Sequence, residues 1–283
     1  MEKLLSAEDF SFWDKNGYVV IPDVVPPQNL QAVIDEIWDF LGMSPDEPDD
    51  WYREPATKGG MVEMYQTQGL WNNRQHPKVH QAFSEIWGTQ KLWVSMDRAN
   101  FKPPQREDKP DWKHEGMIHW DLDTSKRPIA FGVQGVLYLE DTGEDPGTFQ
   151  CVPGFHRYFE EWVRSQPEDR NPSHPDLEGL DISKIAGKAG DLLIWHRLLA
   201  HGNSVNRSDR PRLAQYITMS PANDVDEKAR KDRVHLWKER LSPKGFLGDE
   251  RRWEENNPPA ELTDLGRRLV GLDTWSGQPE EVD

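Results

Sequence analysis

The sequence is short of cysteine, of long apolar runs and of positive charge. Its 283 residues contain one cysteine, Cys151, which excludes an intrachain disulfide and a four-cysteine zinc site. No apolar run reaches the roughly 18 residues that a membrane-spanning helix needs, so we expect none. Residues 1–13 also lack the apolar core of a secretion signal, which makes a cytoplasmic location the default expectation.

The shortage of positive charge limits the partners that the protein can have. Lysine and arginine number 34 against 50 acidic residues, a formal net charge of −16. Such a surface repels nucleic acid and anionic membranes, so we expect neither as a partner. A small-molecule substrate remains open, even an anionic one, because a pocket can carry its own arginine. The sequence indicates no obligate protein partner.

Aromatic residues are plentiful, and they indicate a folded chain. They make up 10% of the sequence and include 13 tryptophans. Disordered chains are poor in such residues, so we expect an aromatic-rich core beneath an acidic surface.

The apolar pattern changes along the chain from helical to strand-like. Helical spacing predicts helices over about 27–41 and 79–87, with residues 43–60 as a loop between them. Short apolar or alternating segments then predict strands at about 92–101, 117–119, 129–139, 148–152, 191–196 and 212–219. This order favours a mainly β fold with flanking helices. We expect one domain over residues 1–283, with a helical part to about 90, a β core over about 91–220 and a charged extension over about 221–283.

The first group of residues that could carry chemistry is His119-Trp-Asp121. Side chains two positions apart on a strand leave on the same face, so the imidazole and the carboxylate could bind one metal ion. The pattern alone is weak, because a lone histidine is more often structural than a ligand.

A second group strengthens the metal hypothesis. His201 follows the apolar segment 191–196 and a short turn, and Arg212 opens the next predicted strand. His196 competes with His201, but it directly follows an apolar run and is more simply a buried structural residue. His119, Asp121 and His201 would form a two-histidine, one-carboxylate set, which leaves positions open on Fe(II) and suits O₂ activation. Arg212 could hold a carboxylate through two hydrogen bonds.

The sequence resembles the phytanoyl-CoA dioxygenase family of Fe(II)- and 2-oxoglutarate-dependent oxygenases, which includes the ectoine hydroxylases. The resemblance covers most of residues 9–219. The matching segments are residues 119–121 (His-Trp-Asp), 147–157 (Gly-Thr-Phe-Gln-Cys-Val-Pro-Gly-Phe-His-Arg), 190–191 (Gly-Asp) and 201–212, which begins His-Gly-Asn-Ser. Their order and spacing are far more specific than a histidine and an aspartate alone.

The resemblance implies a double-stranded β-helix, a cupin-like jelly roll with iron at one mouth. In it, His119, Asp121 and His201 would bind Fe(II), and Arg212 would pair with the distal carboxylate of 2-oxoglutarate. Three further residues are candidates for contact with this cosubstrate: Asn203, which stands where the family often has serine, Asn100 and Gln134.

The activity that the resemblance implies is hydroxylation of an unactivated C–H bond in a small organic substrate. O₂ would be consumed, and 2-oxoglutarate would be decarboxylated to succinate and CO₂. Related halogenases have glycine or alanine in place of the carboxylate ligand, so Asp121 favours a hydroxylase. Two alternatives remain: a non-catalytic jelly-roll protein that binds a ligand, and a metal-dependent isomerase or hydrolase on the same barrel.

Overall fold

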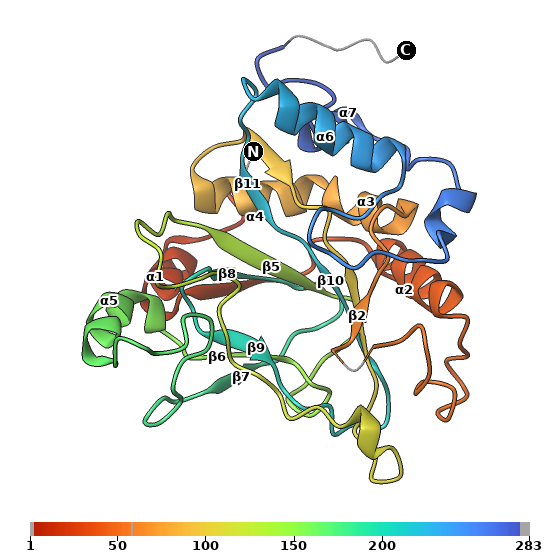
Figure 1. Cartoon of the computed structure of the whole chain (residues 1–283). Helices are drawn as coiled ribbons and strands as arrows, with labels where there is room; N and C mark the ends of the chain where they lie inside the picture. The colour runs from red at the N-terminus through yellow and green to blue at the C-terminus, as the bar shows by residue number, and fades with distance from the viewer. Residues whose placement is uncertain (1–2, 58, 278–283) are drawn as a thin grey trace.

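The computed structural model describes residues 3–57 and 59–277 as antiparallel sheets with helices packed outside them (Figure 1). The elements are α1 (Ala7–Asn16), β1 (Tyr18–Ile21), α2 (Pro27–Leu41), β2 (Met61–Val62), α3 (Gln68–Arg74), α4 (Pro77–Trp87), β3 (Leu92–Val94), β4 (Ala99–Lys102), η1 (Pro110–Trp112), β5 (Val133–Tyr138), β6 (Phe149–Cys151), α5 (Phe155–Ser165), β7 (Ser183–Ile185), β8 (Leu192–His196), β9 (His201–Asn203), β10 (Arg212–Tyr216), β11 (Met219–Pro221), α6 (Glu227–Lys238), η2 (Trp253–Asn256) and α7 (Asp264–Val270).

A six-stranded sheet of order β1-β8-β5-β10-β4-β2 crosses the middle of the molecule. Helices α2, α3 and α4 cover one face, and the three-stranded sheet β7-β6-β9 lies against the other (Figure 1). A two-stranded sheet of β3 and β11 continues beyond one end. Strands β1 and β2 come from the expected helical part of the chain, and both join the six-stranded sheet.

The two faces of the six-stranded sheet pack into two separate apolar clusters. In β8, Leu192 and Ile194 point to the helices, whereas Leu193 and Trp195 point to the smaller sheet. Alternate residues of a strand point to opposite faces, so strands that are buried on both sides read as continuous apolar runs. The same alternation places Arg212 on the inner face, between the sheets, together with Ala214 and Tyr216.

Helices α2 and α4 confirm the expectations for 27–41 and 79–87. Helix α2 begins at Pro27, whose ring fixes a φ that suits the first turn, and ends at Gly42 in the left-handed conformation with φ 61°. Its apolar stripe, which includes Val33 and Ile37, is fully buried against the sheet. Helices α3 and α5 were not expected, and α3 contributes a buried arginine, Arg74, to the core.

Two expected strands are each broken into two. The segment 92–101 forms β3 and β4 in different sheets, and 212–219 likewise forms β10 and β11. The breaks lie side by side: Ser95 N donates to Thr218 O at 2.7 Å, and Tyr216 N donates to Arg98 O at 3.0 Å. Apolar periodicity continues through both breaks, so the sequence alone did not reveal them.

The expected strand at 117–119 is also wrong. Only His119 pairs there, in an isolated antiparallel bridge to His201. Gly116, with φ 76°, turns the chain immediately before this segment, so no ladder extends from the bridge.

The charged C-terminal extension packs onto the body through α6, η2 and α7. Glu254 in η2 is buried, and its carboxylate accepts hydrogen bonds from Tyr65 N at 2.9 Å and Gln66 N at 2.5 Å. These bonds join the extension to the loop before α3. Within the described residues, no helix has both the length and the apolar character needed to cross a membrane.

We expect Glu254→Gln to lower the free energy of unfolding by about 1–3 kcal/mol. The amide has one acceptor oxygen, so one of the two backbone N–H groups would lose its partner. Burial raises the pKa of Glu254 to about 7, so chemical denaturation is best measured above that pH, where the carboxylate is ionised. The matched control is the more exposed neighbour Glu255→Gln, for which a loss of equal size would contradict this role of Glu254.

Candidate metal centre and adjoining cavity

His119, Asp121 and His201 meet at one point between the two sheets. The bridge between the histidines sets their positions: His119 N donates to His201 O at 2.8 Å, and His201 N donates to His119 O at 3.0 Å. The Asp121 carboxylate lies 3.1 Å from His119 Nε2 and 3.4 Å from His201 Nε2. Each residue therefore offers one ligand atom to a common point, and the three atoms lie within 4.8 Å of one another.

The spacing of these atoms fits a metal ion. Ligand atoms about 2.1 Å from an ion and at right angles lie about 3.0 Å apart, close to the two observed nitrogen–oxygen distances. His201 Nδ1 lies 2.8 Å from the carbonyl oxygen of Leu199, so this nitrogen carries the proton and Nε2 keeps a free lone pair. Two imidazoles and one carboxylate on one side would leave the other side of the ion open.

Gln134 holds the carboxylate ligand in place. Its Nε2 donates to Asp121 Oδ2 at 2.6 Å. Burial alone would raise the pKa of Asp121, but the adjacent His119 and His201 imidazoles and the hydrogen bond from Gln134 lower it well below its usual range. The carboxylate is therefore ionised, as a metal ligand must be.

Arg212 is buried on the inner face of the six-stranded sheet without a carboxylate to balance it. Only 1% of its surface is exposed. Nη1 donates to Asn100 Oδ1 at 3.0 Å, but Nε and Nη2 have no hydrogen-bond partner among the described residues. Nε and Nη2 form one edge of the guanidinium, the edge that grips a carboxylate with two parallel bonds. An unpaired charge buried in this way is costly unless an anion joins it.

Lys102 adds a second buried cation to the same place. It lies directly opposite Arg212 in the register of β4 and β10. Its Nζ donates to Ser204 O at 2.8 Å and lies 3.0 Å from His114 Nδ1. Burial, together with the charge of Arg212, lowers the pKa of Lys102 to about 7. The sequence analysis did not identify Lys102, although it stands two positions after Asn100 and so shares its inner face.

A cavity of about 310 Å³ opens in front of the three ligands. Its wall combines the metal-binding residues with aromatic side chains and with residues from both strand breaks. The lining includes Phe149, Trp195, Tyr216, Asp97, Arg98, Thr218 and, from the C-terminal extension, Phe246. Sequence reasoning missed Asp97, Arg98 and Phe246, because the cavity forms only where the broken strands separate.

The other predicted residues take different places around this cavity. Asn203 lines it and donates to Tyr216 Oη at 3.0 Å. Gln134 also lines the cavity, and its amide contacts Asp121. Asn100 is not among the lining residues, and it accepts a hydrogen bond from Arg212. His196 is not part of the cluster, and its ring packs against His156.

The model of the phytanoyl-CoA dioxygenase family, PhyH, matches residues 13–214. A Dictyostelium discoideum protein named for the same family is 24% identical over 266 residues, which cover 77% of this chain and 76% of the relative. The ectoine dioxygenase of Bordetella bronchiseptica is 24% identical over 231 residues, covering 74% and 73%.

Solved structures share the fold at lower identity. GIG2 from Candida albicans is 14% identical, with a TM-score of 0.73 over 98% of this chain and 78% of that one. SnoN, the nogalamycin-biosynthesis epimerase solved with Fe³⁺, α-ketoglutarate and nogalamycin RO, is 16% identical with a TM-score of 0.56, over 90% and 94%.

We expect Gly202→Ala to weaken metal binding by about 10–100-fold. A Cβ atom at Gly202 would lie 1.6 Å from the carbonyl oxygen of Met117, so the segment that carries His119 would have to move. Competition with a chelator for Fe(II) or Co(II) measures the change. Gly143→Ala is the control, because its Cβ would have no neighbour nearer than 3.9 Å. Unchanged affinity in Gly202→Ala would show that the bridge does not fix the ligands.

Proposed function

This chain belongs to the phytanoyl-CoA dioxygenase family, and we propose that it is an Fe(II)- and 2-oxoglutarate-dependent oxygenase that hydroxylates a small organic substrate. The reaction would insert one oxygen atom of O₂ into an unactivated C–H bond. The other atom would enter succinate as 2-oxoglutarate loses CO₂. The observation that carries the proposal is a metal-binding triad beside a buried arginine with two free N–H groups.

The triad would hold the iron through His119 Nε2, an Asp121 carboxylate oxygen and His201 Nε2. Bound Fe(II) supplies the open coordination positions and the redox chemistry that O₂ reduction requires, which protein side chains lack. The protein fixes the geometry: the Leu199 carbonyl sets the His201 tautomer, and the Gln134 amide orients Asp121.

Arg212 would bind the distal carboxylate of 2-oxoglutarate through Nε and Nη2. Asn100 already occupies Nη1, which leaves the paired edge of the guanidinium for the cosubstrate. Lys102 would add a second positive charge beside it once a dianion is bound, because the dianion favours the charged form of the lysine. Together the two cations favour a dianion over a neutral ligand, and Asn203 with Tyr216 would complete the wall of the site.

The presence of Asp121 as a carboxylate ligand would favour hydroxylation over halogenation. A carboxylate ligand occupies the position that a halide would need. The buried Arg212 argues against an isomerase or hydrolase on the same barrel, because neither reaction requires an anion site there. A non-catalytic binding protein would have no use for the complete set of three ligands and Arg212.

We further infer that the six-stranded and three-stranded sheets are the two halves of a double-stranded β-helix. Their inner faces enclose the triad and Arg212, as a jelly roll with iron at one mouth requires. The strands contributed by residues 18–21 and the packing of Glu254 favour one domain over residues 1–283.

The test is the visible spectrum of the anaerobic Fe(II) protein during titration with 2-oxoglutarate. We expect a charge-transfer band in the wild type. Arg212→Met should require about 10–100-fold more 2-oxoglutarate for the same band, because it loses a charge-assisted pair of hydrogen bonds. Arg210→Met is the control, since that side chain is 74% exposed. Iron binding without a band in the wild type would exclude the oxygenase and favour the isomerase or hydrolase.

The low pKa of Lys102 predicts how 2-oxoglutarate affinity depends on pH. The lysine is charged only below about pH 7 in the free protein, and the bound dianion favours its charged form. Affinity should therefore fall as pH rises through about 7, by at most about tenfold per pH unit, with a proton taken up on binding. Calorimetry in buffers of different ionisation enthalpy measures this uptake. Lys102→Met should abolish it, whereas the exposed control Lys113→Met should retain it; uptake that persists in Lys102→Met would assign it elsewhere.

A further inference from the structure

We propose that the substrate is an organic cation whose ammonium group binds the carboxylate of Asp97, an inference that rests on the proposed function. Asp97 lies in the break between β3 and β4 and lines the same cavity as Asp121. It would anchor the charged end of the substrate, and the apolar remainder would lie toward the metal centre.

The main chain around Asp97 is fixed by three hydrogen bonds, two with Thr218 and one from Arg74. Ser95 N donates to Thr218 O at 2.7 Å, and Thr218 N donates to Ser95 Oγ at 3.1 Å. Arg74, fully buried beneath the segment, donates through Nη2 to Asp97 O at 2.5 Å. The carboxylate is therefore held in place before any ligand arrives, which lowers the entropy cost of binding.

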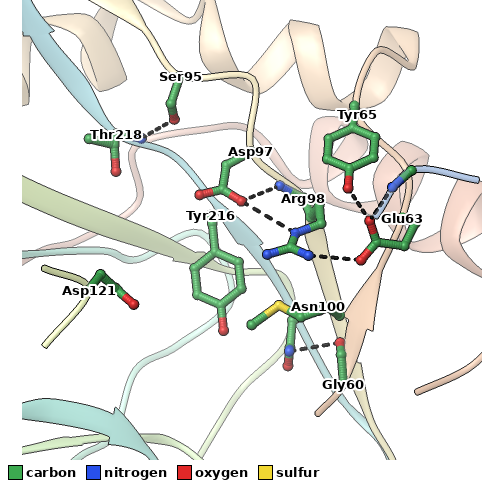
Figure 2. Close-up of polar contacts among 12 residues, drawn as sticks. Gly60, Glu63, Tyr65, Ser95, Asp97, Arg98, Asn100, Asp121, Tyr216 and Thr218 are labelled. Atoms are coloured by element: carbon green, nitrogen blue, oxygen red, sulfur yellow. Dashed lines mark hydrogen bonds and ion pairs between the residues drawn. The ribbon is translucent and has the colours of Figure 1, made fainter. Parts of the chain in front are cut away.

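The carboxylate of Asp97 has a free side that faces the cavity. Oδ1 accepts a hydrogen bond from Arg98 N at 2.7 Å and lies 3.8 Å from Arg98 Nε. Oδ2 accepts no hydrogen bond from any described residue and points away from Arg98 (Figure 2). Of the side-chain surface 29% is accessible, and it lies along the cavity.

Arg98 is already neutralised by another acid. Its Nη1 donates to Glu63 Oε1 at 2.8 Å, and its guanidinium stacks 4.3 Å from the ring centre of Phe246. Tyr65 Oη and Gly248 N donate to the other oxygen of Glu63, which fixes that carboxylate (Figure 2). Asp97, Arg98 and Glu63 together carry a charge of −1, and Arg74, the other nearby cation, also faces the carboxylates of Glu254 and Glu36. The Asp97 oxygen that faces the cavity has no hydrogen-bond donor among the described residues.

A cation offsets the cost of this arrangement. Burial raises the pKa of Asp97 although Arg98 and Arg74 act to lower it, so these two cations do not fully offset the cost of burying the ionised carboxylate. An ammonium group would supply a further cation. The rings of Phe246 and Tyr216 face the same space and add an apolar and π-rich wall that suits an alkyl or aromatic amine.

The test uses three probes with one hydrocarbon skeleton and different charges: cyclohexylmethylammonium, cyclohexylmethanol and cyclohexanecarboxylate. Each is titrated by calorimetry into the full chain loaded with 2-oxoglutarate and redox-inactive Zn(II). We expect the ammonium to bind at least about tenfold more tightly than the alcohol, the range of a charge-assisted hydrogen bond. The carboxylate should bind most weakly.

Two variants separate direct contact from general charge. Asp97→Asn keeps the acceptor for Arg98 N but loses the charge, so the ammonium should bind no better than the alcohol. Glu63→Gln removes the same unit of charge without touching Asp97 and should retain most of the preference. Equal loss in both variants would assign the preference to the overall field and overturn the contact.

The remaining outcomes also decide the matter. Equal affinities, tighter binding of the carboxylate or no binding of any probe overturns the inference while the 2-oxoglutarate chelate still forms on Fe(II). Failure of that chelate in the wild type overturns the proposed function and this inference together. In Asp97→Asn the chelate should form as in the wild type, which confirms that the variant is folded.

Discussion

The candidate site depends on one pair of main-chain hydrogen bonds between His119 and His201. The bridge is isolated, and among the described residues its two bonds are the main-chain hydrogen bonds that join the segment carrying His119 and Asp121 to strand β9. Gly202 permits the close approach, because its missing side chain leaves room for the carbonyl group of Met117. Two segments about 80 residues apart thereby present three ligand atoms to one point.

Two buried basic side chains, Arg212 and Lys102, lie on the inner face of the six-stranded sheet. The strand alternation of β10 and β4 turns Arg212, Asn100 and Lys102 inward, between two apolar layers. No described carboxylate forms an ion pair with either cation, so the site is electrically incomplete until an anion enters. The interior thus has a positively charged region at Arg212 and Lys102 and a negatively charged carboxylate at Asp97. His119, Asp121 and His201 line the same cavity as Asp97.

The sequence predicted the parts that local pattern determines. The ends of α2 and α4 follow from proline and glycine, and the motifs together with the family resemblance singled out His119, Asp121 and His201, which lie together in the structure. Contact between Asn100 and the cosubstrate stays a prediction, and the sequence did not predict the hydrogen bond that Asn100 accepts from Arg212, because that contact depends on the register of β4 and β10. The breaks at 95–98 and 217–218 could not be predicted. Residues distant in sequence, such as Arg74, make hydrogen bonds to the main chain at these breaks. The helix that carries Arg74, α3, is itself too short to show a clear helical period in the sequence.

The cavity wall has two different origins within the chain. The family match ends at residue 214, whereas Phe246, which stacks on Arg98, belongs to the C-terminal extension. The extension therefore supplies one side of the cavity from outside the part of the chain that matches the family model. Under the proposed function, a change at Phe246 would alter the space offered to the substrate without touching His119, Asp121, His201 or Arg212.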